Sequence, residues 1–288
     1  MSRFSTIRFA VLIAGFLLAA CGNQPTPASP TAAASPTVLV EPSATATAVS
    51  FPGTAVTFDR LSLVIPAGVA AGGNGILAPE TKGDRVAPWD VAPEHIQFTL
   101  DGYALADKFH QPRIHVYPAQ AYAELQERGT AAQSLERLRA VLAQSAMVNI
   151  KELPQVPFFN VSQTLAAQVE VIPFQNGRGV RMVTEYAMAR AIINNHELFY
   201  HFEGLTDDGQ YYVVAILPVT APGLPEDGQP GSPVPPGGLP VPDFDDMNAN
   251  WMGYYGDARQ MLQGLEPGAY TPNLDQLDAL IGSLTIAP

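Results

Sequence analysis

Five histidines are the side chains most suited to chemistry in this chain of 288 residues: His95, His110, His115, His196 and His201. The second and third are five residues apart, and so are the last two. Within one strand an odd spacing places two side chains on opposite faces, so neither pair is spaced to chelate one metal ion. The spacing also differs from that of a zinc-protease helix. We therefore expect strand and turn histidines that bond their neighbours, with no metal and no cofactor.

Three acidic residues, Asp243, Asp245 and Asp246, gather at the end of a proline-rich segment. Carboxylates in such a cluster can bind calcium weakly. More often they cap the following helix or place favourable charge in its first turn, and we prefer this interpretation. A metal-dependent hydrolase that uses the histidines and these acids stays as an alternative function, beside a purely structural envelope protein.

Motifs of nucleophilic catalysis are missing from the sequence. It contains neither a Gly-x-Ser-x-Gly elbow nor a Ser-x-x-Lys motif, so we expect no enzymatic activity. A ligand surface could instead be built from Tyr200, Phe202, Tyr211 and Tyr212, which lie in two β-like runs. The simplest role of these aromatic side chains is in the core, and lining a pocket or a partner surface is the alternative.

Cys21 is the only cysteine, and it follows a segment typical of a signal peptide. Arg3 and Arg8 come first, and residues 9–20 form an apolar run that is short for crossing a bilayer. Residues 18–21, Leu-Ala-Ala-Cys, resemble the lipobox of bacterial lipoproteins. This resemblance implies cleavage before Cys21, diacylglycerol on its sulfur and acylation of the new amine. A secretory peptide with an incidental cysteine is the alternative.

The charge of the chain indicates which partners to expect. It has 15 basic and 27 acidic residues, a formal charge of −12. Removing residues 1–20 takes away two arginines and no acid, which leaves 13 basic residues and a charge of −14. Nucleic acid is therefore not an expected partner, because phosphate binding needs clustered Lys and Arg. We expect attachment to a bacterial membrane through lipid on Cys21, an extracytoplasmic body, and an unknown protein or small-molecule partner.

The composition divides the chain into three parts. Residues 1–20 are the expected signal peptide, and residues 21–50 are rich in Pro, Ala, Ser and Thr. Such a segment buries too little apolar surface to fold, so it predicts a disordered tether. Residues 51–288 are expected to form one α+β domain, with a Pro/Gly-rich insertion at 221–243.

The domain is organised around residues 167–220, which read as four antiparallel strands in a meander. Residues 211–217 are apolar at both odd and even positions, which predicts a strand covered on both faces. Arg181 and Glu185 share one face of a neighbouring strand and need partners if that face is covered.

Around this meander we expect strands at 61–66, 96–100 and 113–117, and a final edge strand near 284–286. Helices are predicted from Ala119, from Thr130, across 251–265 and from Thr271-Pro272. Residues 67–91, with the run Gly72-Gly73-Asn74-Gly75, are expected to be a loop.

The order of these elements resembles that of the PsbP-type α/β sandwich. The segment Ile65-Pro66-Ala67-Gly68 after a strand, a helix, an antiparallel meander and a last helix ending near Ser283 carry the resemblance. The family includes accessory proteins of photosystem II and secreted bacterial domains. The resemblance implies a sheet covered by helices and binding or assembly work without catalysis, and it supplies no site residues.

Overall fold

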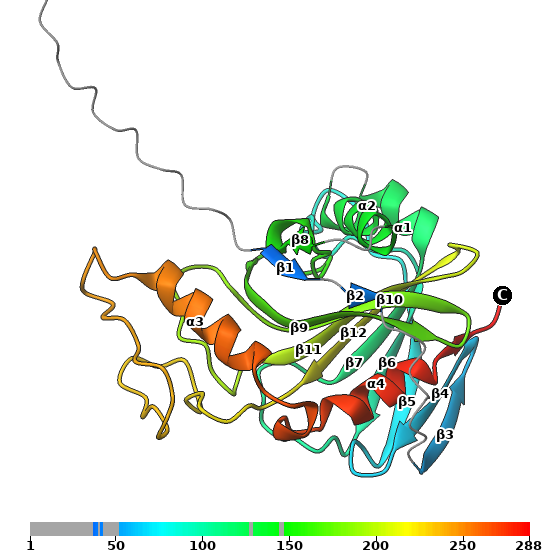
Figure 1. Cartoon of the computed structure of the whole chain (residues 1–288). Coiled ribbons are helices and arrows are strands. Elements are labelled where there is room, and N and C mark those ends of the chain that lie inside the picture. The colour runs from blue at the N-terminus through cyan, green and yellow to red at the C-terminus, as the bar shows by residue number, and fades with distance from the viewer. Residues whose placement is uncertain (1–36, 40, 43–51, 127–128, 144–146) are drawn as a thin grey trace, which may run out of the picture. The chain divides into compact units, whose positions relative to one another are not determined.

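The computed structural model describes residues 37–39, 41–42, 52–126, 129–143 and 147–288. Figure 1 shows the elements as an α+β arrangement, as predicted. The strands are β1 (Thr37–Leu39), β2 (Glu41–Pro42), β3 (Gly53–Phe58), β4 (Leu61–Pro66), β5 (Gly72–Ala78), β6 (His95–Asp101), β7 (Arg113–Pro118), β8 (Met147–Asn149), β9 (Ser162–Phe174), β10 (Gly177–Ala187), β11 (Phe199–Thr206), β12 (Tyr211–Pro218) and β13 (Thr285–Ile286). The helices are α1 (Ala119–Leu125), α2 (Thr130–Ala143), α3 (Trp251–Gln263) and α4 (Leu274–Gly282), with short 3₁₀ turns at Ile150–Glu152 and Pro267–Ala269.

A large sheet forms the centre of the described chain, in the order β2-β9-β10-β11-β12-β7-β6-β5. All its neighbours pair antiparallel except β2 and β9, which are parallel. The predicted meander is confirmed as β9 to β12. Its second connection, residues 188–198, is longer than the tight turn expected near Asn194, because this segment extends to pack against α3 through bonds from its backbone to Tyr254 and Tyr255.

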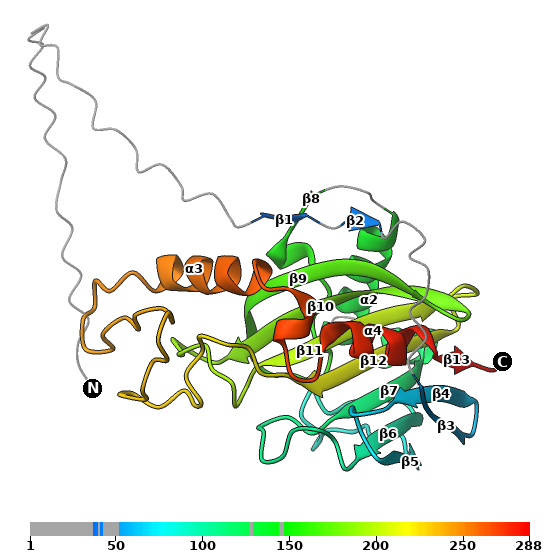
Figure 2. The same cartoon turned by 60° about the horizontal axis from the view of Figure 1, so that its bottom comes forward.

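Both faces of β12 are covered, as its continuous apolar run predicted. Val213, Ala215 and Leu217 belong to a core formed with α3, α4 and the small sheet. Tyr212 and Val214 belong to a second core on the opposite face, formed with α1 and α2. Figure 2 shows α3 and α4 following one another along the chain, and both helices contact β9.

A smaller sheet, β13-β4-β3, lies beside β5 and includes the predicted final edge strand. The prediction of a loop at residues 67–91 is wrong at β5, where the glycine-rich run is a strand. A Cβ added to Gly73 would lie 2.5 Å from the ring of Phe98, and one added to Gly75 would lie 2.1 Å from that of Phe58. These glycines therefore make room for aromatic rings that pack directly on the backbone.

Part of the segment predicted as tether is in strands. β1 pairs with β8, and β2 pairs with β9 at the edge of the large sheet. The expectation of no regular structure over 21–50 is therefore wrong for residues 37–39 and 41–42, because a short extended segment can still bond to an open strand edge. The rest of the predicted tether lies outside the described residues.

The insertion at 221–243 lies within one compact unit that extends from Ser35 to Pro288. Ala221 and Leu224, near its start, are buried in the core. The side-chain amide of Asn195 bonds the carbonyls of Ala221 and Leu224. The start of the insertion is therefore packed on the body, while residues 226–233 are largely exposed.

The last two helices begin later than their predicted caps. Asn250 caps α3 by accepting a bond from the Gly253 N–H, so the three aspartates before it are not its N-cap. Asp243 and Asp246 instead accept bonds from the backbone two residues on, which forms tight turns. Asn273, not Thr271, caps α4.

Candidate functional site

The four aromatic residues predicted as a ligand surface do not lie together. Tyr200 and Phe202 belong to the core under α3 and α4, whereas Tyr212 belongs to the core under α1 and α2. All three are fully buried. Tyr211 is partly exposed and borders a groove, so it is the member of the set that can touch a ligand.

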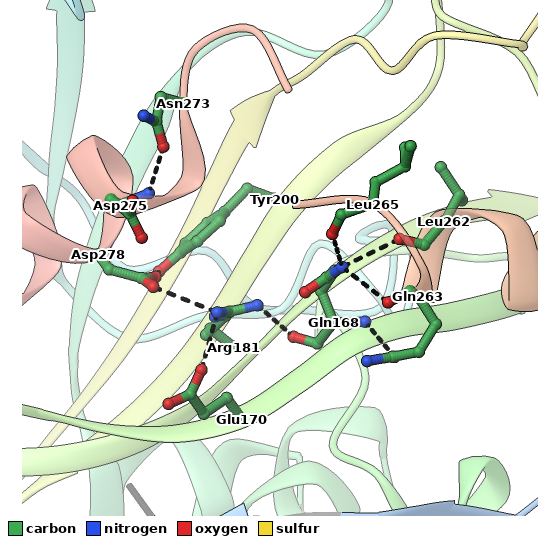
Figure 3. A network of polar contacts seen from close by, with 10 residues as sticks. All are labelled: Gln168, Glu170, Arg181, Tyr200, Leu262, Gln263, Leu265, Asn273, Asp275 and Asp278. Carbon is green, nitrogen blue, oxygen red and sulfur yellow. Dashed lines mark hydrogen bonds and ion pairs between the residues drawn. The ribbon is translucent and has the colours of Figure 1, made fainter. Parts of the chain in front are cut away.

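Tyr200 belongs to a polar network that joins α4 to the sheet (Figure 3). The guanidinium of Arg181 lies 2.8 Å from the Glu170 carboxylate and 3.3 Å from the Asp278 carboxylate. The Tyr200 hydroxyl donates to Asp278 across 2.8 Å. Burial raises the pKa of Asp278, and the Arg181 guanidinium opposes that shift. A buried arginine is thus neutralised by two carboxylates, which is a structural arrangement rather than the floor of a pocket.

The same network holds the end of α3 through a β-bulge in β9. Gln168 and Val169 stand opposite the single residue Met182, and the φ of Gln168 is 54°. This left-handed conformation directs the Gln168 side-chain amide to the carbonyls of Leu262, at 3.0 Å, and Leu265, at 2.9 Å. The Gln168 carbonyl accepts a bond from Arg181. The bulge therefore ties β9 to carbonyls at and just after the C-terminal end of α3.

Glu185, the other charged residue predicted to need a partner, is fully buried. Its Oε2 accepts a bond of 3.0 Å from the Asn194 N–H, and its Oε1 has no hydrogen-bond partner among the described residues. Burial raises the pKa of this carboxyl well above its usual range. Burial therefore favours the neutral form of this carboxyl over the charged form.

Tyr212 is part of a second buried polar group, under α1. Its hydroxyl donates to Oε2 of Glu203, and Oε1 of Glu203 lies 2.9 Å from Nε2 of His201. All three side chains are fully buried. The group ties β11 to β12 inside the sheet, and it is not open to a ligand.

A groove of about 670 Å³ lies at one end of the sheets, where turns and strand ends from five parts of the chain meet. They are the β3–β4 turn, β5, the start of β6, the junction of β7 with α1 and the β11–β12 turn. Its lining residues are Asp59, Arg60, Leu77, Glu94, His95, Ile96, Val116, Pro118, Gln120, Asp208, Gly209, Gln210 and Tyr211.

Arg60 and Tyr211 form a fixed pair in this groove. The guanidinium carbon of Arg60 lies 4.9 Å from the centre of the Tyr211 ring, and Nη1 donates to the Tyr211 hydroxyl. Nε of Arg60 is also 3.7 Å from the Asp59 carboxylate. The cation is therefore already engaged with Tyr211 and Asp59, which leaves Glu94 and Asp208 as the charged groups available to a ligand.

His95 lines the groove with an imidazole whose tautomer is set by its neighbours. Its Nδ1 lies 2.9 Å from the Pro93 carbonyl, which can only accept, so Nδ1 carries the proton. Its ring stacks on Tyr117 at 4.3 Å. Burial lowers the pKa of His95, although the bond to Pro93 opposes the shift. The lowered pKa favours the neutral imidazole, in which Nε2 is the acceptor nitrogen; both His95 and Glu94 line the groove.

The remaining histidines lie in aromatic surroundings. His110 stacks on Phe159 at 5.2 Å and meets Phe199 edge-on at 4.5 Å, and burial lowers its pKa to about 4. His115 is 3.2 Å from the Tyr117 hydroxyl, and burial lowers its pKa to about 3. In the described part of the chain, no three His, Cys, Asp or Glu side chains come together as metal ligands.

Cys21 lies outside the described residues, so its lipidation stays a prediction. Within the described ranges, no helix has the length and apolar character needed to cross a bilayer.

Comparisons with known proteins provide no family for this chain. No protein-family model matches it, and no curated protein or solved structure is significantly similar to it. The resemblances to bacterial lipoproteins and to the PsbP-type family therefore stay predictions.

Proposed function

We propose that the chain is a lipoprotein held on a bacterial membrane, whose extracytoplasmic body acts as a binding or accessory module. The observation that carries this proposal is the Leu-Ala-Ala-Cys sequence at residues 18–21, directly after an apolar run of signal-peptide length. Two or three acyl chains hold a protein firmly on a bilayer, whereas a body of charge −14 gains nothing from anionic lipid. The PsbP-type resemblance agrees with a binding role.

The groove beside Tyr211 is the ligand site of this proposal. It contains the Arg60 guanidinium, which Tyr211 and the Asp59 carboxylate already engage, and two carboxylates, of Glu94 and Asp208, that form no ion pair with a described residue. With His95 neutral, acceptors outnumber free donors. Such a site favours a ligand that donates hydrogen bonds and carries positive charge, which means a small amine. Leu77 and the uncovered part of Tyr211 supply apolar contact for its carbon chain.

Binding of a polyamine tests this assignment. Spermidine is titrated into the ¹⁵N-labelled full-length protein in detergent, with sorbitol as an uncharged ligand of similar polarity. We expect saturable shifts at the backbone amides of residues 94–96 and 208–211 with spermidine, and none with sorbitol.

A charge-matched pair of variants separates the groove from general attraction to an acidic protein. Glu94→Gln and Glu226→Gln each remove one exposed carboxylate, but only the first lies in the groove. Glu94→Gln should weaken spermidine binding about tenfold, and Glu226→Gln should leave it unchanged. Equal weakening by both variants, or shifts spread over the whole surface, would reject the groove as the site.

A further inference from the structure

Arg190 has an unusual place among the cations of this acidic chain. Its side chain is exposed, and it forms no ion pair with a described residue. It lines a hollow of about 530 Å³ at the amino-terminal end of α3. Among the described residues that line this hollow, Arg190 is the one charged side chain. A guanidinium without an acidic partner favours a ligand with an anionic group, such as a phosphate.

Two segments of the chain build the hollow, the residues that follow β10 and the first turns of α3. The N–H of Ala191 donates across 3.0 Å to the Tyr255 hydroxyl, which fastens the first segment to the helix. Burial raises the pKa of Tyr255, and the charge of Arg190 is among the effects that oppose this shift. Arg190 therefore lies near Tyr255, and the hollow combines a cation with an aromatic wall.

Aromatic and amide side chains provide more of the lining. Trp251 lines the hollow beside Tyr255, with their ring centres 6.0 Å apart, and the Phe244 ring is 4.6 Å from that of Trp251. Aromatic faces attract ammonium groups, and Trp and Tyr are enriched where proteins meet the membrane–water interface. Asn248 and Asn250 add amide groups that can bond a polar head group.

Three exposed methionines accompany this lining. Met188 is 85% exposed, Met247 is 84% and Met252 is 71%. Met252 lines the hollow, and each of the other two comes directly before a lining residue in the sequence. Methionine is normally covered, and its long, unbranched side chain adapts to irregular apolar surroundings. Exposed apolar side chains next to a cationic hollow suit a ligand with a charged head and apolar chains, which is a lipid.

The acidic residues nearby determine which lipid fits. Phe244 lies in the sequence among three exposed aspartates, Asp243, Asp245 and Asp246. Together with the net charge of the body they disfavour an anionic surface, whereas carboxylates and aromatic rings both attract an ammonium group. We propose that this end of α3 docks on a bilayer of zwitterionic phospholipid, with a head-group phosphate on Arg190 and the ammonium group at the aspartates and rings.

This docking is a second membrane contact, made by the folded body. It rests on the proposed membrane location, but not on the lipid at Cys21. If that lipid is present, it holds the body close to the bilayer, so even weak docking is populated. The hollow shares no lining residue with the groove beside Tyr211, so docking and ligand binding use different residues.

A paramagnetic lipid measures this contact directly. The full-length protein, with ¹³C-labelled methionine methyl groups, is placed in nanodiscs of phosphatidylethanolamine and phosphatidylcholine, in which some head groups carry a gadolinium chelate. We expect strong relaxation enhancement at the methyl groups of Met188, Met247 and Met252, and little at those of Met182 and Met261. Replacing half of the lipid by phosphatidylglycerol should reduce the enhancement, because the aspartates repel anionic head groups.

Matched variants separate docking from simple nearness to the bilayer. Arg190→Gln should reduce the enhancement at Met188 and Met247 about fivefold, because it removes the cation that meets the phosphate. Arg139→Gln, at another exposed arginine, should leave the enhancement unchanged. The full-length Cys21→Ser protein, added to preformed discs, should show the same methyl pattern and the same dependence on Arg190, so a failure of the lipid anchor does not decide this test.

Three results would overturn the proposal. One is an enhancement that Arg190→Gln leaves at the wild-type level, and another is an enhancement that phosphatidylglycerol increases. The third is loss of the enhancement when excess glycerophosphoethanolamine is added, because this compound has the head group without acyl chains and would identify the hollow as a site for a free phosphate ester.

Discussion

The buried carboxyl of Glu185 makes stability depend on pH at the scale of one residue. Burial raises its pKa well above that of the unfolded chain, so above about pH 4.5 the folded state holds a proton that the unfolded state has released. The stability that this carboxyl contributes is therefore fully present below its pKa in the unfolded chain. It is lost as the pH rises through its pKa in the folded protein.

Glu185→Gln removes this titration while keeping the shape of the side chain. We expect the free energy of unfolding of the variant, relative to the wild type, to increase with pH by up to about 1.4 kcal/mol per pH unit between pH 5 and 7. Urea unfolding at three pH values measures the difference. Glu226→Gln, at an exposed position, is the control and should show no such slope; a constant difference for Glu185→Gln would mean that the carboxyl is ionised in the folded state.

The sequence indicates which charged residues need partners, and not which partners they find. Arg181 and Glu185 stand out because they interrupt a strand that neighbouring apolar runs predict to be covered. One partner of Arg181, Glu170, lies on β9, which pairs with the strand that contains Arg181. The other, Asp278, comes from α4, almost a hundred residues after Arg181 in the chain. Tyr200, Phe202 and Tyr212 are equally ambiguous, because apolar bulk suits a core and a ligand surface alike.

At the scale of the element, the bulge at Gln168 decides how α3 is held. A non-glycine residue at a φ of 54° is strained, and the bonds of its amide to the end of α3 offset this strain. Glutamine is not one of the residue types that favour a left-handed backbone conformation, so the sequence provides no signal of the bulge.

Two substitutions at this position separate the side chain from the backbone. Gln168→Ala should lower the free energy of unfolding by about 1–3 kcal/mol, because it removes the bonds and keeps the strain. Gln168→Gly also removes the bonds but relieves the strain, so it should be about 1 kcal/mol more stable than Gln168→Ala. Urea denaturation of both variants measures these differences. A Gln168→Ala protein as stable as the wild type would show that the bonds do not hold α3.

Helices and strands were predicted correctly where the apolar periodicity of the sequence is strong. The prediction failed where packing against other segments determines the residue types of an element. The meander, α2 and the central strands have clear apolar patterns. β5 does not, because its glycines are selected by the rings of Phe58 and Phe98, which come from other strands. The groove is unpredictable for the same reason: its lining residues come from five turns and strand ends that only the fold brings together.

For the whole molecule, the insertion at 221–243 divides into a packed part and an exposed part. Replacing residues 226–233 by a short Gly-Ser connection should change stability by less than about 1 kcal/mol, since loop closure depends weakly on length. Leu224→Ala, in the packed part, should cost about 2–5 kcal/mol, because Leu224 is buried in the main core. Thermal unfolding compares the two variants. Two separate transitions in the wild type would contradict a single compact unit.

The predicted tether determines how far the body can lie from the membrane. β1 pairs with β8 and β2 pairs with β9, so residues 37–39 and 41–42 of the predicted tether lie on the body. If the predicted tether is extended over residues 22–36, at about 3 Å per residue it would reach several tens of ångströms, enough for the groove to meet a partner away from the lipid surface.

The direct test is the membrane retention of Cys21→Ser, expressed in a bacterium that processes lipoproteins. Membranes are washed with high salt to remove electrostatic attachment and then extracted with detergent. We predict that the wild type stays in the membrane fraction until detergent is added, whereas Cys21→Ser, which cannot form the thioether to diacylglycerol, is recovered in the soluble fraction. A Cys21→Ser protein that resists the salt wash and needs detergent for release would contradict the lipoprotein assignment.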